Sequence, residues 1–510
     1  MTEKEGFDTA PFGVQGLDQL LGGGLWRGRP YIIYGGPGTC KTTLSLHFAM
    51  DGAQRGESVL YVTFSESRTD LNLVAKSHEW DLGGIDVMDL TEEIATQHTE
   101  KQQTVLSSDE VEFNELVESV LQSIREKKPQ RLVIDSMTDL RVLANNPILF
   151  RRQIFALKRL SRELGSTMLL IDLPTGGVQQ SEILDLAHGV ILLEERMAAY
   201  GRSRRRLQIE KMRAKSFPTG YHDMTIDAGG LQVHPRLEPQ HRKAELSEVM
   251  SSGIQGLDDL FGGGLVSGTS SLFLGPAGSG KTSLSTLYVH TAARRGERSS
   301  VYLFDETTAT FERRAEGLGV PVKDFVDQGL ILERQLAAGE ISPGEFSNLV
   351  KQDVEEHGSK IVIIDSLTGY AFTMLEESLL IVHLHELVNY LSSRGVLTLM
   401  VSTEHGLLSP IGYREKVELS YLADSVLLSR HFEAEGVVRQ AISVIKKRYG
   451  SHEHSIRELQ FGRGRIEIGP PLKEFGAVLS GSPRFEGNRD QLLASFEGER
   501  GRSEKGETNQ

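Results

Sequence analysis

The sequence predicts an α/β protein made of two similar domains in tandem, and three observations support this. Residues 13–48 and 253–288 align without a gap at an offset of 240, and both contain the stretch GGGL. In each copy, short apolar runs alternate with amphipathic segments, as strands and helices do in an open α/β domain. Several runs are apolar nearly throughout, which is typical of parallel strands covered on both faces. A chain of 510 residues is long enough to bury two full cores.

Five strands are expected in the core of each copy. In the first copy they are 31–35, 58–64, 131–136, 167–172 and 189–194; in the second they are 271–275, 300–304, 361–366, 398–402 and 425–429. A polar linker with two prolines lies near 233–248, so we expect domains at 1–240 and 241–480. The tail, 481–510, is polar and glycine-rich and is expected to be flexible.

Composition narrows the class of protein. No apolar run approaches the roughly 20 residues of a membrane helix, and the start, MTEKEGFDTAPFG, has no signal-peptide pattern. The single cysteine excludes an internal disulfide, so a reducing, cytoplasmic location is expected. The net charge of −14 disfavours a nucleic-acid partner, although a local basic channel would be compatible with it.

The second copy contains a complete phosphate-binding loop, GPAGSGKTS (275–283), directly after an expected strand and before an expected helix. Backbone N–H groups of such a loop surround phosphates, the lysine neutralises β/γ oxygens, and the threonine can ligate Mg²⁺. A chance glycine-rich turn is the alternative. The nucleotide-binding candidates here are Ala277, Gly278, Ser279, Gly280, Lys281, Thr282 and Ser283.

The first copy contains nearly the same loop, GGPGTCKTT (35–43), with Cys40 in place of the last glycine. If that position requires a positive φ, the Cβ costs on the order of 1 kcal/mol. We expect ATP to bind with altered affinity; the alternatives are a dead site or a redox-sensitive thiol with a lowered pKa. The candidates here are Gly36, Gly38, Thr39, Cys40, Lys41, Thr42 and Thr43.

Acidic residues follow two core strands in each copy. Asp135 and Asp365 end apolar strands, where they could hold Mg²⁺ beside Thr42 and Thr282; capping a nearby turn is the alternative. Hydrolysis also needs a group that orients or deprotonates the attacking oxygen. The candidates for that role follow the second strand of each copy: Glu66, Asp305 and Glu306. Exposed carboxylates at a strand end are also common without a function, which is the alternative. Asp305 is a candidate metal ligand as well.

These motifs together resemble the KaiC family of tandem RecA-like ATPases, over roughly residues 10–485. The resemblance rests on the paired phosphate loops, the GGGL lead-in, the acidic pair after the second strand, the [IV]DS motif and a late KxR. It implies a double-ring homohexamer with ATP and Mg²⁺ between adjacent subunits. It also implies that two basic triplets reach a neighbour's nucleotide, although a solvated basic strand is the alternative, and that Ser77 lies near the nucleotide. The triplets are Lys211, Met212, Arg213 and Lys446, Lys447, Arg448.

The resemblance further implies an ATPase with Ser/Thr autokinase and autophosphatase activity in timing or signalling, such as a circadian rhythm. The family's adjacent serine and threonine phosphosites correspond to Ser420 and Tyr421. Because tyrosine replaces the threonine, an ordered two-site cycle is not expected, and a buried structural serine is the alternative for Ser420. The family's first glutamate in each acidic pair is Ser65 and Asp305 here. Because serine is not a useful base at neutral pH, first-domain hydrolysis depends on Glu66 or is slow.

The resemblance implies a KaiB-like partner. KaiA binding is not predicted, since the tail departs from the family pattern after SGSP (480–483). Two other functions stay open. One is a RecA/RadA-like DNA-repair ATPase, and the other is a slow-turnover, ATP-dependent assembly scaffold. The acidic balance disfavours the first of these, and Ser65 favours the second.

Overall fold

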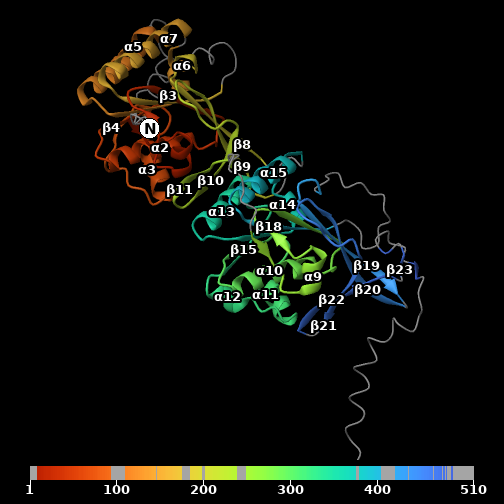
Figure 1. The fold of residues 1–510 in the computed structure, drawn as a ribbon. Coiled ribbons are helices and arrows are strands. Elements are labelled where there is room, and N and C mark those ends of the chain that lie inside the picture. Colours follow the sequence, from red (N-terminus) through yellow and green to blue (C-terminus); the bar gives the residue numbers. More distant parts are fainter. Residues whose placement is uncertain are drawn as a thin grey trace, which may run out of the picture. The chain divides into compact units, whose positions relative to one another are not determined.

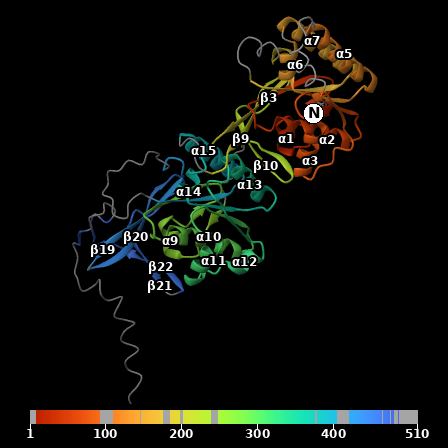
Figure 2. The same cartoon turned by 180° about the vertical axis from the view of Figure 1, so that it is seen from behind.

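The structure is a computed structural model, shown from opposite sides in Figures 1 and 2. It describes residues 8–92, 109–144, 146–174, 184–197, 201–237, 248–374, 378–403, 420–434, 436–462, 464–473, 475–476, 478 and 484–485. The chain divides into two compact units, 1–236 with 342–348 and 237–341 with 349–510. Most of the expected linker (238–247) and all of the expected flexible tail except 484–485 lie outside the described residues.

The first unit combines strands and helices in alternation, followed by a run of strands. Its strands are β1 (Thr9–Ala10), β2 (Leu25–Trp26), β3 (Pro30–Gly35), β4 (Val59–Thr63), β5 (Asp86–Asp89), β6 (Arg131–Asp135), β7 (Thr167–Asp172), β8 (Gly189–Arg196), β9 (Arg204–Met212), β10 (Tyr221–Asp227) and β11 (Gly230–His234). Its helices are α1 (Gln15–Leu20), α2 (Lys41–Gln54), α3 (Arg68–Ser77), α5 (Asp109–Lys127), α6 (Met137–Ala144) and α7 (Pro147–Leu164).

The second unit repeats this arrangement. Its strands are β12 (Val249–Met250), β13 (Leu265–Val266), β14 (Ser270–Gly275), β15 (Ser299–Leu303), β16 (Ile331–Gln335), β17 (Ile361–Asp365), β18 (Leu397–Thr403), β19 (Ser425–Ala434), β20 (Val437–Lys447), β21 (Arg457–Gly462), β22 (Arg465–Pro471), β23 (Phe475–Gly476) and β24 (Arg484–Phe485). Its helices are α9 (Gln255–Leu260), α10 (Lys281–Arg294), α11 (Thr308–Gly317), α12 (Lys323–Asp327), α14 (Leu367–Ala371) and α15 (Ser378–Ser393). Helix α13 (Pro343–Glu355) begins in the residues grouped with the first unit and ends in the second.

Each unit is built on one nine-stranded mixed sheet. The strand order is β11-β10-β9-β8-β3-β7-β6-β4-β5 in the first unit and β16-β15-β17-β18-β14-β19-β20-β21-β22 in the second, the same order read from the opposite edge. In this sheet order, neighbouring strands are parallel from β5 through β4, β6, β7 and β3 to β8, and likewise from β16 to β19. The strands that follow, β8 to β11 and β19 to β22, pair antiparallel. The predicted tandem α/β fold is therefore confirmed, with an antiparallel extension that the sequence did not predict.

The core strands are buried because helices cover both faces of each sheet. In the first unit, α1, α2 and α3 lie on one face and α5, α6 and α7 on the other (Figures 1 and 2). The apolar side chains of β3, β4, β6 and β7 accordingly divide between two hydrophobic clusters, one on each face. All ten predicted core strands are present. None of the helices within the described ranges is long and apolar enough to cross a membrane.

Candidate functional site

The glycine-rich loop of each unit joins a central parallel strand to a 14-residue helix, β3 to α2 and β14 to α10. Neither helix has a side-chain hydrogen bond at its N-cap. The first N–H groups of the helix are therefore available to a ligand, and the helix dipole favours an anion at this end. Both loops lie where a phosphate group would bind.

The loop lysine of each unit folds back over its own loop. The Lys41 Nζ donates to the carbonyl oxygens of Gly35 at 2.8 Å and Gly36 at 2.7 Å, and the Lys281 Nζ donates to the Pro276 oxygen at 2.7 Å. Burial lowers the pKa of Lys41, because it disfavours the charged ammonium. A bound phosphate would offer this ammonium an ionic partner in place of neutral carbonyls.

Cys40 has the left-handed conformation that the loop requires, with φ 70° and ψ 33°, as Gly280 does at φ 89° and ψ 7°. A Cβ on Gly280 would meet the Phe461 ring at 2.4 Å, so the second loop has no room for a side chain. The first unit has Ile226 where the second has Phe461, and Cys40 packs against the first unit's core. Burial raises the pKa of the Cys40 thiol, which disfavours the reactive thiolate of the redox alternative.

The strand-ending aspartate of the first unit lies beside the loop threonine. The Thr42 Oγ1 donates to the Asp135 Oδ2 at 3.0 Å, and the buried Tyr61 hydroxyl donates to the same oxygen at 2.8 Å. Burial raises the pKa of Asp135, while the hydrogen bonds from Tyr61 and Thr42 oppose that shift. A hydroxyl and a carboxylate at this spacing fit a Mg²⁺ ion that keeps several waters and also binds phosphate.

Asp365 of the second unit is buried in the same position at the end of β17. Burial raises its pKa to about 6, although a hydrogen bond from Thr282 opposes this. Its Oδ2 has no hydrogen-bond partner among the described residues, and a buried carboxylate oxygen in that state fits a cation. No group of three or more His, Cys, Asp or Glu within the described ranges could hold a metal alone. Both sites thus suit a Mg²⁺ bound together with phosphate.

The predicted catalytic carboxylates differ between the units. Glu66 is exposed, and its charge helps to raise the pKa of the nearby Asp135. In the second unit, Asp305 accepts a hydrogen bond from the Ser366 hydroxyl. Glu306 forms a two-pronged ion pair with Arg314 at 2.5 and 2.7 Å. Glu306 is therefore held in an ion pair with Arg314, whereas the exposed Asp305 lies beside the Ser366 hydroxyl.

The basic triplets lie at the other end of the central strands from the loops. Lys211 of β9 lies opposite Val190 of β8, and Val190 lies opposite Ile32, near the start of β3. The phosphate loop follows the other end of β3. The second triplet is placed in the same way, since Lys446 pairs with Val426 and that residue with Leu272. Within one unit, the structure does not bring the triplet and the loop together.

The individual side chains of the triplets face different surroundings. The Lys211 Nζ and the Arg213 guanidinium donate to backbone oxygens of residues 184–185, whereas Met212 is buried in its own unit. Lys447 donates to the Phe261 and Gly264 oxygens of its own unit. Burial lowers the pKa of each of the lysines.

The candidate phosphosites lie beside the second triplet. The Lys446 Nζ donates to the Ser420 carbonyl oxygen at 2.8 Å, and Arg448 donates to that of Tyr421 at 2.7 Å. The Tyr421 side chain is exposed, and Ser420 is partly exposed. Neither residue lies near the loop of its own unit. Ser77, at the end of α3, is exposed, and its hydroxyl donates to the Val74 oxygen at 2.7 Å.

Sequence reasoning missed several residues that touch these sites. One of them is Arg205 of β9, which donates to the Gly38 oxygen at 3.5 Å. Its counterpart Gln440 of β20 donates to the Gly278 oxygen at 2.9 Å; by the resemblance, this residue replaces an arginine that the KaiC family has ahead of the second triplet. The offset of 235 that relates the two triplets also relates Arg205 to Gln440. Alignment of the two copies could therefore have identified these residues as equivalent positions. For Tyr61, and for Asp139, which accepts a hydrogen bond from Ser136, we see no such signal.

Comparison with known proteins agrees with this geometry. The family model described as "ATPase: KaiC" matches twice, over residues 10–238 and 250–473. The chain is similar to the circadian clock oscillator protein KaiC of Picosynechococcus sp., at 26% identity over 92% of this chain and 91% of that protein. It is similar to KaiC of Thermostichus vulcanus at 25% identity, over 93% and 91% of the two chains. KaiC 1 of Synechocystis sp. is 24% identical over 92% and 91%.

Proposed function

The chain belongs to the KaiC family of ATPases, and on that premise we propose that it is an ATP-dependent homohexamer that phosphorylates itself on Ser420. ATP and Mg²⁺ bind at both loops, and the second unit transfers phosphate to a neighbouring copy. The proposed domains are 1–240 and 241–480, followed by a flexible tail at 481–510.

One observation carries this proposal. In both units the phosphate loop lies at one end of the central strands and the basic triplet at the other, with Ser420 beside the second triplet. A lysine–arginine pair stabilises the charge of a transferring γ-phosphate only if it can reach it. A neighbouring copy that places its triplet against this loop completes the site, and it brings its own Ser420 to the same place.

The roles of the residues follow from this arrangement. Thr42 with Asp135, and Thr282 with Asp365, hold Mg²⁺ together with phosphate oxygens. Asp305 accepts the proton of the attacking hydroxyl. The remaining loop residues and Ser77 bind the nucleotide, and Glu66 and Glu306 assist at the two sites. Tyr421 is a bulky replacement for a second phosphosite, so a single phosphorylation step is proposed in place of an ordered cycle.

A second candidate function is an ATP-dependent scaffold with little turnover. Ser65 favours it, because the first unit has no carboxylate at the position of Asp305. A cytoplasmic timing or signalling role with a KaiB-like partner, and without KaiA, is part of the main proposal. A RecA/RadA-like role in DNA repair has no support from any described residue.

Mapping of phosphate tests the main proposal. The full-length protein is incubated with ATP and Mg²⁺, and phosphorylated residues are identified by mass spectrometry. We expect phosphate on Ser420, its loss in Ser420→Ala, and its loss in Asp305→Asn while ATP binding persists. ATP binding and assembly without phosphate near 415–426 would favour the scaffold instead.

A further inference from the structure

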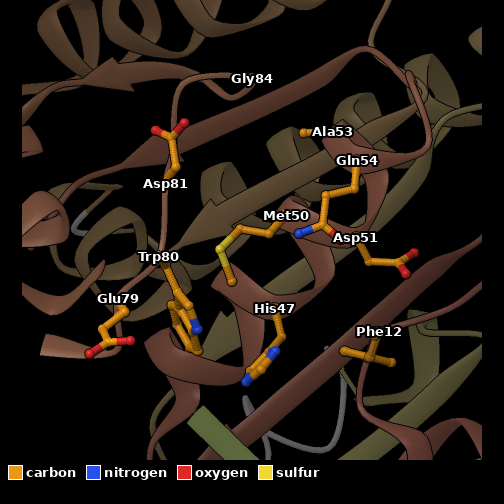
Figure 3. A pocket seen from close by; sticks show the side chains of 11 residues that line it. Phe12, His47, Met50, Asp51, Ala53, Gln54, Glu79, Trp80, Asp81 and Gly84 are labelled. Atoms are coloured by element: carbon orange, nitrogen blue, oxygen red, sulfur yellow. The ribbon is translucent and has the colours of Figure 1, made fainter. Parts of the chain in front are cut away.

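The first unit contains a cavity of about 570 Å³ on the side of α2 that faces away from the sheet. The N-terminal segment and the turn between α3 and β5 form its other walls. Figure 3 shows the Trp80 indole, the His47 ring and the Met50 side chain converging around it, and Phe12 at one side. The cavity is separate from the phosphate loop, which lies at the opposite end of α2.

Three aromatic rings, those of Phe12, His47 and Trp80, line this cavity together with Met50 and several polar side chains. The His47 and Trp80 rings are edge-to-face with centroids 4.5 Å apart, and His78 lies 4.7 Å from the Trp80 ring. The His47 Nε2 accepts a hydrogen bond from the Leu231 N–H at 3.0 Å, and burial lowers the pKa of His47 to about 4. The imidazole is therefore neutral at physiological pH. The His47 and Trp80 rings therefore give one wall of the cavity a neutral aromatic surface, which suits another aromatic group.

In the second unit, the equivalent surface, the outer face of α10, is covered by a longer turn. The two turns begin alike, because the N–H of Trp80 donates to the Ala75 oxygen as that of Val320 donates to the Ala315 oxygen. They also end alike at a buried isoleucine, Ile85 or Ile331. Between these points the first unit has residues 81–84, whereas the second has 321–330, which include α12.

Helix α12 carries an aromatic residue onto the outer face of α10. The ring of Phe325 is edge-to-face with that of His290, with centroids 5.6 Å apart, and it packs against the core of its unit. His290 occupies the position of Met50 in the repeat. The first unit lacks the helix and its phenylalanine, and a cavity lies over Met50 instead.

The charges around the cavity narrow the kind of group that would fill it. No lysine or arginine is among the residues that line it, and the carboxylates of Glu79 and Asp81 are exposed at its edge. The Asp51 Oδ2 forms ion pairs with the Arg131 Nη2 and the Arg55 Nε, each at 2.8 Å. Anionic ligands such as nucleotides are therefore disfavoured, and an aromatic group flanked by positive charge is favoured.

We propose that this cavity is a docking site for a partner protein, which inserts an aromatic side chain from a short segment with basic flanks. The partner's segment takes the place that α12 takes in the second unit. Within the described ranges, α12 covers this place in the second unit, whereas the place is open in the first, so the partner binds one unit of the chain and not its repeat. This inference does not depend on the proposed phosphorylation.

The experiment uses the protein's own α12 as the probe. The peptide covers residues 320–331 with Asp324→Lys and Asp327→Lys, and p-benzoylphenylalanine replaces Phe325. It is photo-crosslinked to the full-length protein with ATP present, and the attachment sites are mapped by mass spectrometry. We expect crosslinks on Met50 or Gln54, which line the cavity. An unlabelled peptide should compete about tenfold better with phenylalanine than with alanine at 325.

Three variants are matched to this probe. Trp80→Val introduces the residue of the second unit and should reduce crosslinking about tenfold, as should replacement of 81–84 by 321–330. Glu79→Gln with Asp81→Asn should remove the advantage of the lysine-bearing peptide over the natural 320–331 sequence. Crosslinks outside the cavity, or equal crosslinking in Trp80→Val, would overturn the proposal.

Discussion

The Ser136 hydroxyl donates a hydrogen bond to the Asp139 carboxylate at 2.5 Å. In the second unit the corresponding serine, Ser366, donates to Asp305 instead. Asp139 lies in α6, whereas Asp305 follows β15, so the same serine position is bonded to carboxylates from two different elements. The two units have thus diverged beside the strand-ending aspartate although their folds correspond.

The sequence differences explain this divergence. The first unit has Ser65 where the second has Asp305, and the second has Gly369 where the first has Asp139. A side chain on Gly369 would collide with Asp305, because its Cβ would lie 2.6 Å from the carboxylate. Each unit therefore has room for one acidic side chain at this serine.

The first prediction concerns Ser65→Glu made together with Asp139→Gly, which reproduces the pairing of Asp305 with Gly369 and frees the space beside Ser136, so every variant in this experiment carries Asp139→Gly. This change places a carboxylate at the end of β4, so we expect ATP turnover by the first unit to rise at least about tenfold. ADP release is measured in an Asp305→Asn/Glu306→Gln background, where the second unit contributes little. The control Ser65→Gln has the same size without the charge. Equal rates for the glutamate and the glutamine would contradict a catalytic role for this position.

The second prediction concerns the loop cysteine. Cys40→Gly removes a side chain from a left-handed position that glycine also adopts, so ATP binding at the first loop should persist. Gly280→Cys is the matched change, and overpacking against Phe461 should lower the free energy of unfolding by about 1–3 kcal/mol. Adding Phe461→Ile reproduces the pairing of Cys40 with Ile226 and should restore most of the stability. Thermal unfolding and ATP binding measure these effects, and a harmless Gly280→Cys would refute the steric argument.

The third prediction concerns the hydroxyl that reaches Asp135. Tyr61→Phe removes a buried hydrogen bond to a carboxylate and should lower the free energy of unfolding by about 1–3 kcal/mol. It should also change the Mg²⁺ concentration needed to retain ATP at the first site. Tyr302→Phe is the control, because Tyr302 donates to Asp353, away from the loop, at 2.6 Å. If both variants shift the Mg²⁺ requirement equally, Tyr61 has no special influence on Asp135.

The fourth prediction is a pH dependence of stability. Burial alone would raise the pKa of Glu57, but hydrogen bonds from Arg27 and the fully buried Arg131 lower it from 4.5 to about 2. A carboxylate with a depressed folded-state pKa stabilises the protein above pH 4.5, and this contribution is lost as the pH falls toward 2. Glu57→Gln should therefore flatten the fall in the free energy of unfolding over this range, as measured by urea denaturation.

The control for that experiment is Glu163→Gln. Glu163 pairs with Arg159 on the exposed surface of α7, at 2.7 Å. Exposed pairs of this kind contribute little, so the variant should change stability by less than about 0.5 kcal/mol. An unchanged pH profile in Glu57→Gln would show that the Arg131 cluster does not stabilise the fold through this carboxylate.

The sequence predicts the central strands well because strands that are covered on both faces are apolar along their whole length, whatever their neighbours are. Runs such as 131–135 and 361–365 are covered on both faces, and their residues are buried throughout. The antiparallel strands were missed for the opposite reason. Strand β9, with the sequence RRRLQIEKM, buries only some of its positions, and its charged residues obscure the pattern.

The candidate site divides in the same way. The loop residues and strand-ending aspartates follow from local motifs whose chemistry dictates their spacing. The hydrogen bond from Tyr61 to Asp135 depends on the register between β4 and β6, and Val301 occupies the corresponding place in the second unit. Hydrogen bonds between side chains of different strands depend on how those strands pair in space, so a single sequence does not predict them.

Transfer of phosphate between copies is the central claim, and a mixing experiment tests it most directly. One variant, Asp305→Asn/Glu306→Gln, keeps Ser420 and its phosphate loop but lacks the acidic pair. The other, Ser420→Ala, keeps the acidic pair but lacks the acceptor. They are mixed before ATP is added, and Ser420 phosphate is quantified by mass spectrometry. We predict phosphate on Ser420 in the mixture and little in either variant alone; a mixture with no more than the separate variants would contradict the account.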